Sequence, residues 1–309
     1  MTNKLYLVWL EWPEACFRAT ADDIRYLKTL VPPGARVLCV HSEASFLRAL
    51  PRATHALVWH FKAEWYARAP RLEVLATPAA GRELVDFRAA PDGVRVHFGG
   101  YHGAIIAETV AAFVLAWARG FFRVQAHKGS IWPRAWLGAD CYTVAGTRAV
   151  IAGYGRIGRA IGAKLESLGV AVEGFGRKNA ADLPRAARSA DWFVLALPGD
   201  TGTDDFLNAK LLAKLPRRCV VVNIGRGNAV DETALRAALE SGRIAGAYLD
   251  VFRNEPTFLR ACKSARNAAS ARPLYQGKCR NLVAMPHSSA FSPNYIRMSF
   301  KELKDEGYL

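Results

Sequence analysis

The sequence has no apolar run close to the roughly 18 residues that a membrane-spanning helix needs. Residues 1–15 include a short apolar stretch but no small-residue cleavage site, so they predict a first β-strand rather than a signal peptide. None of the six cysteines pairs with another at Cys-x-x-Cys spacing, and the histidines do not cluster with them. We therefore expect no metal site, and we expect reduced thiols that are mostly buried.

Acidic residues are scarce: 27 Asp and Glu stand against 42 Lys and Arg, which gives a net charge of +15. The basic residues are scattered, without a block of five or six. This distribution favours an ordinary solvated basic surface, with an anionic small ligand as the second interpretation. A nucleic-acid partner is the least favoured, because the chain shows no nucleic-acid-binding motif.

The rest of the composition is that of a globular protein, with 51% hydrophobic residues among 309, a length that predicts two domains. A composition shift at Gly99-Gly100 marks a boundary. The segment 102–122 is rich in alanine and apolar on nearly all sides, so we expect one long helix, buried between domains or subunits. In the first hundred residues the predicted strands are 5–10, 36–40, 55–59, 72–77 and 94–98, and the predicted helices are 22–30 and 42–50.

From Thr147 onward strands and helices alternate regularly. The apolar runs RAVIAG, VAVEGFG, WFVLALP, RCVVVNIG, IAGAYLDVF and NLVAMP are the expected strands. Further helices are predicted near 182–189, 208–214 and 231–241. Consecutive strand–helix–strand units of this kind predict an α/β fold with a doubly wound parallel sheet.

One turn has the spacing of a dinucleotide-binding loop. Gly153, Gly155 and Gly158 form Gly-x-Gly-x-x-Gly directly between an apolar strand and a predicted helix. In this context the first glycine permits the tight turn, the second lets a pyrophosphate approach the backbone, and the third lets helix and strand pack closely. The N–H groups at the start of the helix then face the anion. The sequence therefore predicts a dinucleotide site.

The end of the next strand bears on which dinucleotide binds. A carboxylate there would hydrogen-bond the ribose 2′-hydroxyl of NAD. Glu173 lies too early, in the middle of the strand, and the tip carries Gly176, Arg177 and Lys178 instead. Two cations without a carboxylate suit a 2′-phosphate, so we expect NADP, with NAD as the alternative cofactor.

Three polar residues follow apolar strands, at the edge where an open parallel sheet binds ligands. Arg226 lies between two glycines, Glu255 ends the run DVFRNE, and His287 opens HSSA. Singly, each has an ordinary structural interpretation as a turn, helix-start or capping residue. Together, downstream of the glycine turn, they suit redox chemistry between a carbonyl and an alcohol.

At these residues the chain resembles the D-isomer-specific 2-hydroxyacid dehydrogenase family, in particular its NADP-preferring glyoxylate and hydroxypyruvate reductases. The resemblance is strong from 99 to 290 and weaker before. It implies a Rossmann dinucleotide-binding domain, 100–287, inserted in a smaller flavodoxin-like α/β substrate domain, 1–99 plus 288–309. The matching stretches are GYGRIGRAIG, ALPGDTGT, VVNIGRGNAVDETAL, GRIAGAYLDVFRNEP and NLVAMPHSSA.

The resemblance implies hydride transfer between a nicotinamide and C2 of a 2-oxoacid. In that reaction Arg226 would bind the substrate carboxylate and polarise the ketone, and His287 would supply the proton. Glu255 would orient His287 and favour its protonated form. The backbone of Ala79, Ala80 and Gly81 would also bind the carboxylate. The further cofactor contacts that the resemblance implies are Arg156, Ile157, Pro198 and Asp250.

The expected substrate is a small anionic 2-oxoacid such as glyoxylate or hydroxypyruvate, used in the reducing direction, and the aromatic residues of the first hundred positions leave a bulkier oxoacid open. The resemblance implies a homodimer through the helix around 107–119, and the cytoplasm is the default location. The alternative function is that of a dinucleotide-sensing, corepressor-like binding protein, for which the basic insertion 257–280 would be a docking surface.

Overall fold

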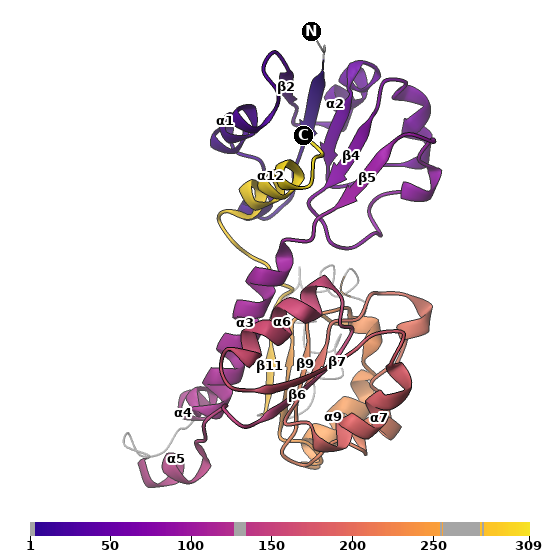
Figure 1. The fold of residues 1–309 in the computed structure, drawn as a ribbon. Helices are drawn as coiled ribbons and strands as arrows, with labels where there is room; N and C mark the ends of the chain where they lie inside the picture. The colour runs from indigo at the N-terminus through magenta and orange to yellow at the C-terminus, as the bar shows by residue number, and fades with distance from the viewer. Residues whose placement is uncertain (1–3, 127–133, 254, 256–278, 280) are drawn as a thin grey trace, which may run out of the picture. The chain divides into compact units, whose positions relative to one another are not determined.

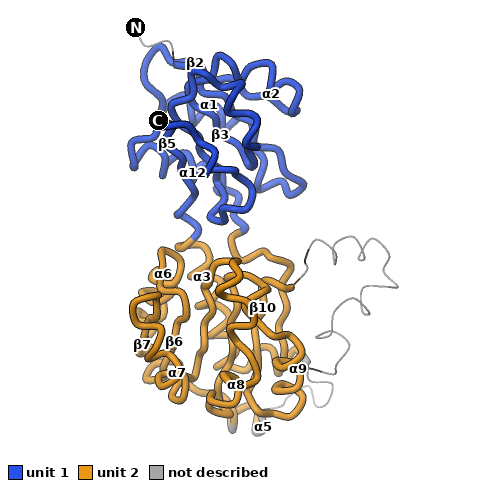
Figure 2. Tube along the Cα trace, turned by 90° about the vertical axis from the view of Figure 1, so that its right-hand side faces the viewer, with its two compact units in different colours: residues 1–102, 291–309 blue, residues 103–290 orange. Residues whose placement is uncertain are grey.

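The structure, a computed structural model, describes residues 4–126, 134–253, 255, 279 and 281–309. The chain forms two compact units, 1–102 with 291–309 (unit 1) and 103–290 (unit 2), as Figure 1 and Figure 2 show. Unit 2 is therefore inserted in the sequence of unit 1. The chain passes from one unit to the other three residues after each of the boundaries expected at 99 and 287. The predicted basic insertion, 257–280, lies outside the described residues apart from Cys279.

Unit 1 contains a five-stranded sheet in the order β2-β1-β3-β4-β5, in which all neighbouring strands are parallel. This is the 2-1-3-4-5 order of flavodoxin-like folds, so the predicted fold class of this unit is confirmed. The strands are β1 (Leu5–Trp9), β2 (Arg36–Cys39), β3 (His55–Val58), β4 (Val74–Thr77) and β5 (Arg95–Phe98).

Helices of unit 1 pack against the sheet and against each other. Phe46 of α2 packs in one cluster with Leu7, Val58 and Leu75, whereas α1 and α12 pack against each other. α1 begins at a capping box in which the side chain of Thr20 accepts the N–H of the third helical residue. The helices are α1 (Ala21–Leu30), α2 (Glu43–Ala49) and α12 (Tyr295–Asp305), with short 3₁₀ helices η1 (Ala15–Phe17), η2 (Leu50–Arg52), η3 (Ala63–Arg68) and η4 (Phe87–Ala89).

Unit 2 contains a six-stranded parallel sheet in the order β11-β10-β9-β8-β6-β7. The chain therefore winds first to one side of β6 and then to the other, which is the doubly wound arrangement that the sequence predicts. The strands are β6 (Arg148–Ala152), β7 (Ala171–Phe175), β8 (Trp192–Leu195), β9 (Val220–Asn223), β10 (Gly246–Leu249) and β11 (Leu282–Ala284).

Helices cover both faces of this sheet. Because successive strand residues point to opposite faces, Ile151 and Val194 pack with α3 and α6, while Val150 and Phe193 pack with α7, α8 and α9. The helices are α3 (His102–Ala118), α4 (Phe121–Ala126), α5 (Arg134–Asp140), α6 (Arg156–Glu166), α7 (Leu183–Ala186), α8 (Ala209–Leu212) and α9 (Glu232–Glu240), with 3₁₀ helices η5 (Ala180–Asp182), η6 (Ala187–Ser189), η7 (Thr201–Thr203) and η8 (Gly227–Ala229).

The expected single helix over 102–122 is wrong in one respect. The chain breaks it after Ala118, because Gly120 adopts a φ of +74°, a left-handed conformation that ends a helix. In the single chain Leu115 is 37% exposed, Phe121 62% and Val124 40%, so the expected burial of this segment between domains or subunits stays a prediction. An apolar strip therefore lies open along α3 and α4.

The cysteines differ from expectation in burial. Cys16, Cys39, Cys141 and Cys279 are half-buried free thiols, and Cys219 is the only fully buried one among those that the structure describes. Cys39 lies on β2, an edge strand with alternating exposure, which explains its accessibility.

Within the described ranges, no helix has the length and apolar character that crossing a membrane requires.

Candidate active site

The glycine turn connects β6 to α6 with only three residues. Gly153 has a φ of +93°, and a Cβ there would lie 2.4 Å from the carbonyl oxygen of Ala196. A Cβ on Gly158 would lie 2.2 Å from the carbonyl oxygen of Gly153. A Cβ on Gly155, by contrast, would meet nothing within 4 Å. The first and third glycines thus permit the fold of the turn, while the second keeps space open in front of the helix.

That space lies at the N-terminus of α6. Gly155 is the N-cap and supplies no capping side chain, and the first turn holds no acidic residue. The opening N–H groups of a helix have no partner inside it, and together with the helix dipole they favour an anion. Arg156 is exposed and Ile157 half-buried in this first turn. The turn therefore fits the pyrophosphate of a dinucleotide.

The tip of β7 is shaped by Asn179, a residue that the sequence analysis missed. Its Oδ1 accepts the N–H of Gly176 at 2.8 Å, and its Nδ2 donates to the carbonyl of Gly174 at 3.0 Å. The turn that results presents Arg177 and Lys178 as exposed side chains. Glu173 instead lies 3.8 Å from Arg148 at the start of β6, so it is directed away from the tip.

His287 and Glu255 meet beyond the carboxyl ends of β10 and β11. Nδ1 of His287 lies 3.0 Å from Oε2 of Glu255, and Oε1 of Glu255 accepts the N–H of Phe252 at 2.7 Å. Because an ionised carboxylate only accepts hydrogen bonds, Nδ1 carries the proton and Nε2 is directed elsewhere. His287 itself has a φ of +54°, which a residue with a Cβ adopts at a cost of about 1 kcal/mol or more.

The charges around this pair bias its protonation. The hydrogen bond to Glu255 raises the pKa of His287 above its usual value; partial burial opposes this rise, the negative charges of Glu255 and Asp250 reinforce it, and Arg226 opposes it. Burial by itself would raise the pKa of Glu255, but the hydrogen bond and charge of His287, the N–H of Phe252 and the charge of Arg226 together lower it. The charged pair is therefore favoured, although His287 is 53% exposed and solvent screens it.

Asp250, which the resemblance implies as a cofactor contact, forms hydrogen bonds with the backbone around His287. It is 2% exposed, and its carboxylate accepts the N–H groups of Ser288 and Ser289 at 2.9–3.2 Å. Its carbonyl accepts the N–H of His287 at 2.8 Å. Asp250 thus holds the strained turn that presents His287, while its contact with a cofactor stays a prediction.

Arg226 is placed by the glycines on either side of it. A Cβ on Gly225 would lie 2.5 Å from the carbonyl oxygen of Leu197, and one on Gly227 would lie 1.9 Å from the carbonyl carbon of Phe252. The fully buried Asn223, another residue that the sequence analysis missed, accepts the N–H of Gly225 and donates to the carbonyl of Arg226. These contacts explain why only glycine fits at both positions.

Two predicted binding segments complete the set. Pro198 is exposed beyond β8, and its carbonyl accepts the hydroxyl of Thr203 at 2.7 Å. Ala79, Ala80 and Gly81 follow β4 in unit 1, where the N–H of Ala79 donates to Oγ1 of Thr77 at 3.2 Å. The structure thus assembles Arg226, Glu255, His287 and Asp250 in unit 2, whereas the predicted carboxylate-binding loop belongs to unit 1.

Comparison with known proteins identifies the family. The sequence model of the D-isomer specific 2-hydroxyacid dehydrogenase NAD binding domain matches residues 111–289, more than half of the chain. A glycerate dehydrogenase of Methylorubrum extorquens is 27% identical over 255 residues, covering 79% of this chain and 77% of its own. A glyoxylate reductase of Thermococcus kodakarensis is 30% identical over 233 residues, covering 67% and 68%.

A solved structure agrees over nearly the whole length. The D-isomer specific 2-hydroxyacid dehydrogenase of Xanthobacter autotrophicus, determined with NADPH and MES, superposes with a TM-score of 0.73 at 25% identity, covering 99% of this chain and 96% of that one. Fold, glycine turn and sequence thus agree with one another. The chain belongs to the D-isomer specific 2-hydroxyacid dehydrogenase family, and it is an oxidoreductase that transfers hydride between a nicotinamide dinucleotide and a 2-hydroxyacid or 2-oxoacid.

Proposed function

We propose that this protein reduces a small 2-oxoacid to the D-2-hydroxyacid, with NADPH as the preferred hydride donor. The observation that carries the proposal is the His287–Glu255 pair near the charge of Arg226, at the carboxyl edge of the sheet that bears the glycine turn. An arginine and a proton donor beyond adjacent strands suit an anionic substrate that gains a proton during reduction. Reductase and dehydrogenase relatives acting on glyoxylate and glycerate support a substrate of this size.

The proposed roles follow from the observed contacts. When bound, the reduced nicotinamide supplies a hydride for C2 of the oxoacid. Arg226 binds the carboxylate of the substrate through its planar fork and stabilises the negative charge that develops on the carbonyl oxygen. Nε2 of His287 gives its proton to that oxygen, so that a C–H and an O–H bond form as the carbonyl double bond becomes single. Glu255 keeps the ring oriented through Nδ1 and stabilises the imidazolium before transfer.

The reducing direction is supported by the raised pKa of His287, because a raised pKa keeps a larger fraction of the molecules with His287 in its proton-donating form near neutral pH.

In unit 1, Ala80 and Gly81 are proposed to bind the substrate carboxylate with their N–H groups. Ala79 is the less suited of the three predicted residues, since its N–H already donates to Thr77.

The preference for NADPH is proposed on the strength of the β7 tip. Arg177 and Lys178 are exposed there, and the nearby Glu173 reaches toward Arg148 instead of the tip. Arg177→Ala is expected to raise the KM for NADPH about 10-fold or more while changing that for NADH little, since one charge-assisted hydrogen bond is worth roughly 1.5–3 kcal/mol. Arg188→Ala is the control with the same change of charge. Arg188 is exposed and precedes β8, so it lies at the amino ends of the strands, away from the β7 tip. Equal changes for both cofactors would contradict the 2′-phosphate assignment.

A homodimer is proposed through α3 and α4, where Leu115, Phe121 and Val124 leave apolar surface exposed in the single chain. Leu115→Glu would place a charge in this strip. We expect light scattering to show a dimer for the parent protein and a monomer for the variant, and a monomeric parent would contradict the proposal.

The direct test of the function is the absorbance of NADPH or NADH at ~340 nm in the presence of glyoxylate, hydroxypyruvate, pyruvate or phenylpyruvate, with the nicotinamide reporting hydride transfer. We expect turnover with the small oxoacids and faster turnover with NADPH. Turnover with phenylpyruvate alone would replace the small substrate by a bulky aromatic one. Binding of both dinucleotides without any turnover would contradict the proposed substrate class and favour a sensing role.

A further inference from the structure

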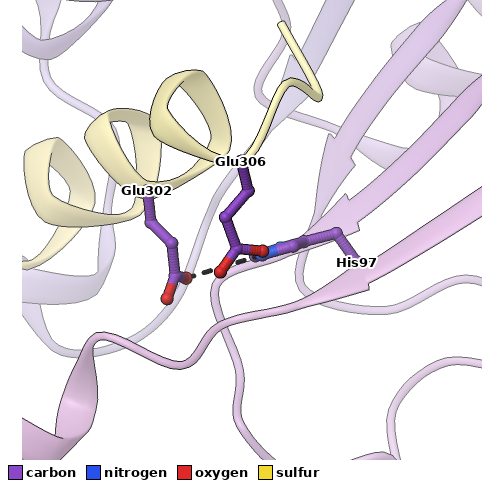
Figure 3. Close-up of side chains that lie close together, drawn as sticks. All are labelled: His97, Glu302 and Glu306. Carbon is purple, nitrogen blue, oxygen red and sulfur yellow. Dashed lines mark ion pairs between the residues drawn. The ribbon is translucent and has the colours of Figure 1, made fainter.

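A second cluster of chemically active side chains lies in unit 1, apart from every residue assigned above. His97 on β5 faces Glu302 and Glu306, at the end of α12 (Figure 3). Nε2 of His97 lies 3.2 Å from Oε2 of Glu306 and 3.6 Å from Oε2 of Glu302. One donor atom from each of the three residues lies within 4.8 Å of the other two. The three side chains therefore converge on one point.

The imidazole at this point is buried and fixed in direction. His97 is only 4% exposed, and its ring packs edge-on against Tyr308, with 4.8 Å between ring centroids. Figure 3 shows the ring pointing from the strand toward both carboxylates. A buried imidazole nitrogen that faces two carboxylates is placed to serve as a hydrogen-bond donor or as a metal ligand.

The two carboxylates add a second constraint. Glu302 lies in the last turn of α12 and Glu306 is the C-cap residue of that helix, so two like charges that repel each other are close together. Both nevertheless turn onto His97, and the carboxylate of Glu302 is held there by the N–H of Gly100 at 2.9–3.1 Å. With a neutral imidazole, the two ionised carboxylates give these three side chains a summed charge of −2. A divalent cation beside a neutral imidazole would balance it.

The observed spacings suit such a cation. Nitrogen and oxygen ligands lie at about 2.0–2.2 Å from Zn²⁺, so two ligands of a tetrahedral site are separated by roughly 3.3–3.5 Å. The distances from His97 to the two glutamates, 3.2 and 3.6 Å, straddle this range. One imidazole with two carboxylates is a donor set that suits zinc and related first-row ions, and a water would complete the four ligands.

We propose that His97, Glu302 and Glu306 bind a divalent transition-metal ion and that this ion links α12 to β5. Zn²⁺ is used as the test ion below. Nε2 of His97 and one oxygen of each glutamate are the protein ligands. The N–H of Gly100 orients Glu302 in the way that outer hydrogen bonds orient metal ligands. The site is independent of the proposed reaction, because none of its ligands belongs to the catalytic set.

The test is isothermal titration of Zn²⁺ into the whole, chelator-treated chain. We expect the parent protein to bind one equivalent more than Glu306→Gln, or to bind it at least ~10–100-fold more tightly, since even the loss of an outer partner of a ligand costs that much. Asp305→Asn is the matched control, because Asp305 is the neighbouring residue, lies at the end of the same helix and pairs with Lys301. It is expected to titrate like the parent.

Thermal unfolding and a second ligand variant test the same metal site. Zn²⁺ should raise the thermal midpoint of the parent and of Asp305→Asn but not that of Glu306→Gln, because a ligand that binds only the folded state stabilises it. His97→Asn should lose the same equivalent, with near-ultraviolet circular dichroism confirming that it folds. Identical zinc stoichiometry and affinity in the parent, Glu306→Gln and Asp305→Asn would overturn the metal site and leave a buried ion pair.

Discussion

The two units wind their sheets in the same order but begin them differently. In both, the first strand lies between the second and the third, and unit 2 adds β11 at the far edge. In unit 2, three residues with two glycines join β6 to α6. In unit 1, residues 10–20 join β1 to α1, contain no glycine, and bring Trp12 and Phe17 against Trp59. The same topology thus carries a dinucleotide turn in one unit and a partly buried aromatic cluster in the other, because the turn and not the strand order provides the site.

The largest effect should come from the proposed proton donor of unit 2. His287→Ala is expected to lower kcat for reduction by about 10²–10⁴-fold, the usual contribution of general acid catalysis. The Kd for the dinucleotide, measured by fluorescence titration, should remain close to that of the parent. His41→Ala in unit 1, where His41 pairs with Glu11, is the control. Unchanged turnover in His287→Ala would remove the proposed acid.

The next effect concerns the turn that distinguishes the units. Gly155→Val would place a side chain in space where a Cβ now meets nothing, so the protein should fold but bind the dinucleotide at least ~10-fold more weakly, as expected when backbone approach to the pyrophosphate is blocked. Gly138→Val, at another glycine with open surroundings, is the control. Equal dinucleotide affinity in the two variants would show that the phosphate does not lie against Gly155.

A smaller effect is expected in the pH profile. If His287 is the proton donor as proposed, the rate of reduction should be highest below the pKa of His287 and should fall as pH rises through that value. Glu255→Gln weakens the hydrogen bond and removes the charge that raise this pKa, so the fall should move to lower pH. Glu11→Gln, which alters the other histidine–glutamate pair, should leave the profile of kcat against pH in place. A profile unmoved in Glu255→Gln would separate the glutamate from the proton donor.

The smallest effect should come from unit 1. Thr20→Ala removes a helix cap, for which about 1 kcal/mol of stability is the usual loss. Urea unfolding should therefore report a lower midpoint, while KM for the dinucleotide stays the same. A changed KM would indicate that the start of α1 takes part in cofactor binding and would weaken the contrast between the units.

Much of the architecture was predictable because its determinants are local. Every strand of both sheets lies in an apolar run bounded by turn residues, and the glycine turn needs only six consecutive residues to be recognised. The helix over 102–122 was predicted without a break, although it contains Gly120, a residue type that often ends a helix in the left-handed conformation that Gly120 adopts.

The candidate site was predictable to a lesser degree. Arg226, Glu255 and His287 follow strands, and the rule for parallel sheets brings such residues to one edge. Asn179 and Asn223 were missed, because they act on backbone groups that a sequence does not place. His97 was missed as a partner of Glu302 for the same reason, since about two hundred residues separate them and no local spacing connects strand β5 with helix α12.

The insertion of unit 2 within unit 1 has a consequence for synthesis on the ribosome. Tyr295, Ile296, Phe300 and Leu303 of α12 are buried, so the hydrophobic packing of unit 1 is incomplete until α12 emerges. Residues 103–290 are translated in between, which takes on the order of 10–40 s at ~5–20 residues per second. During that interval the nascent first unit exposes the surface that α12 later covers, and the dinucleotide-binding unit is the first that can fold completely.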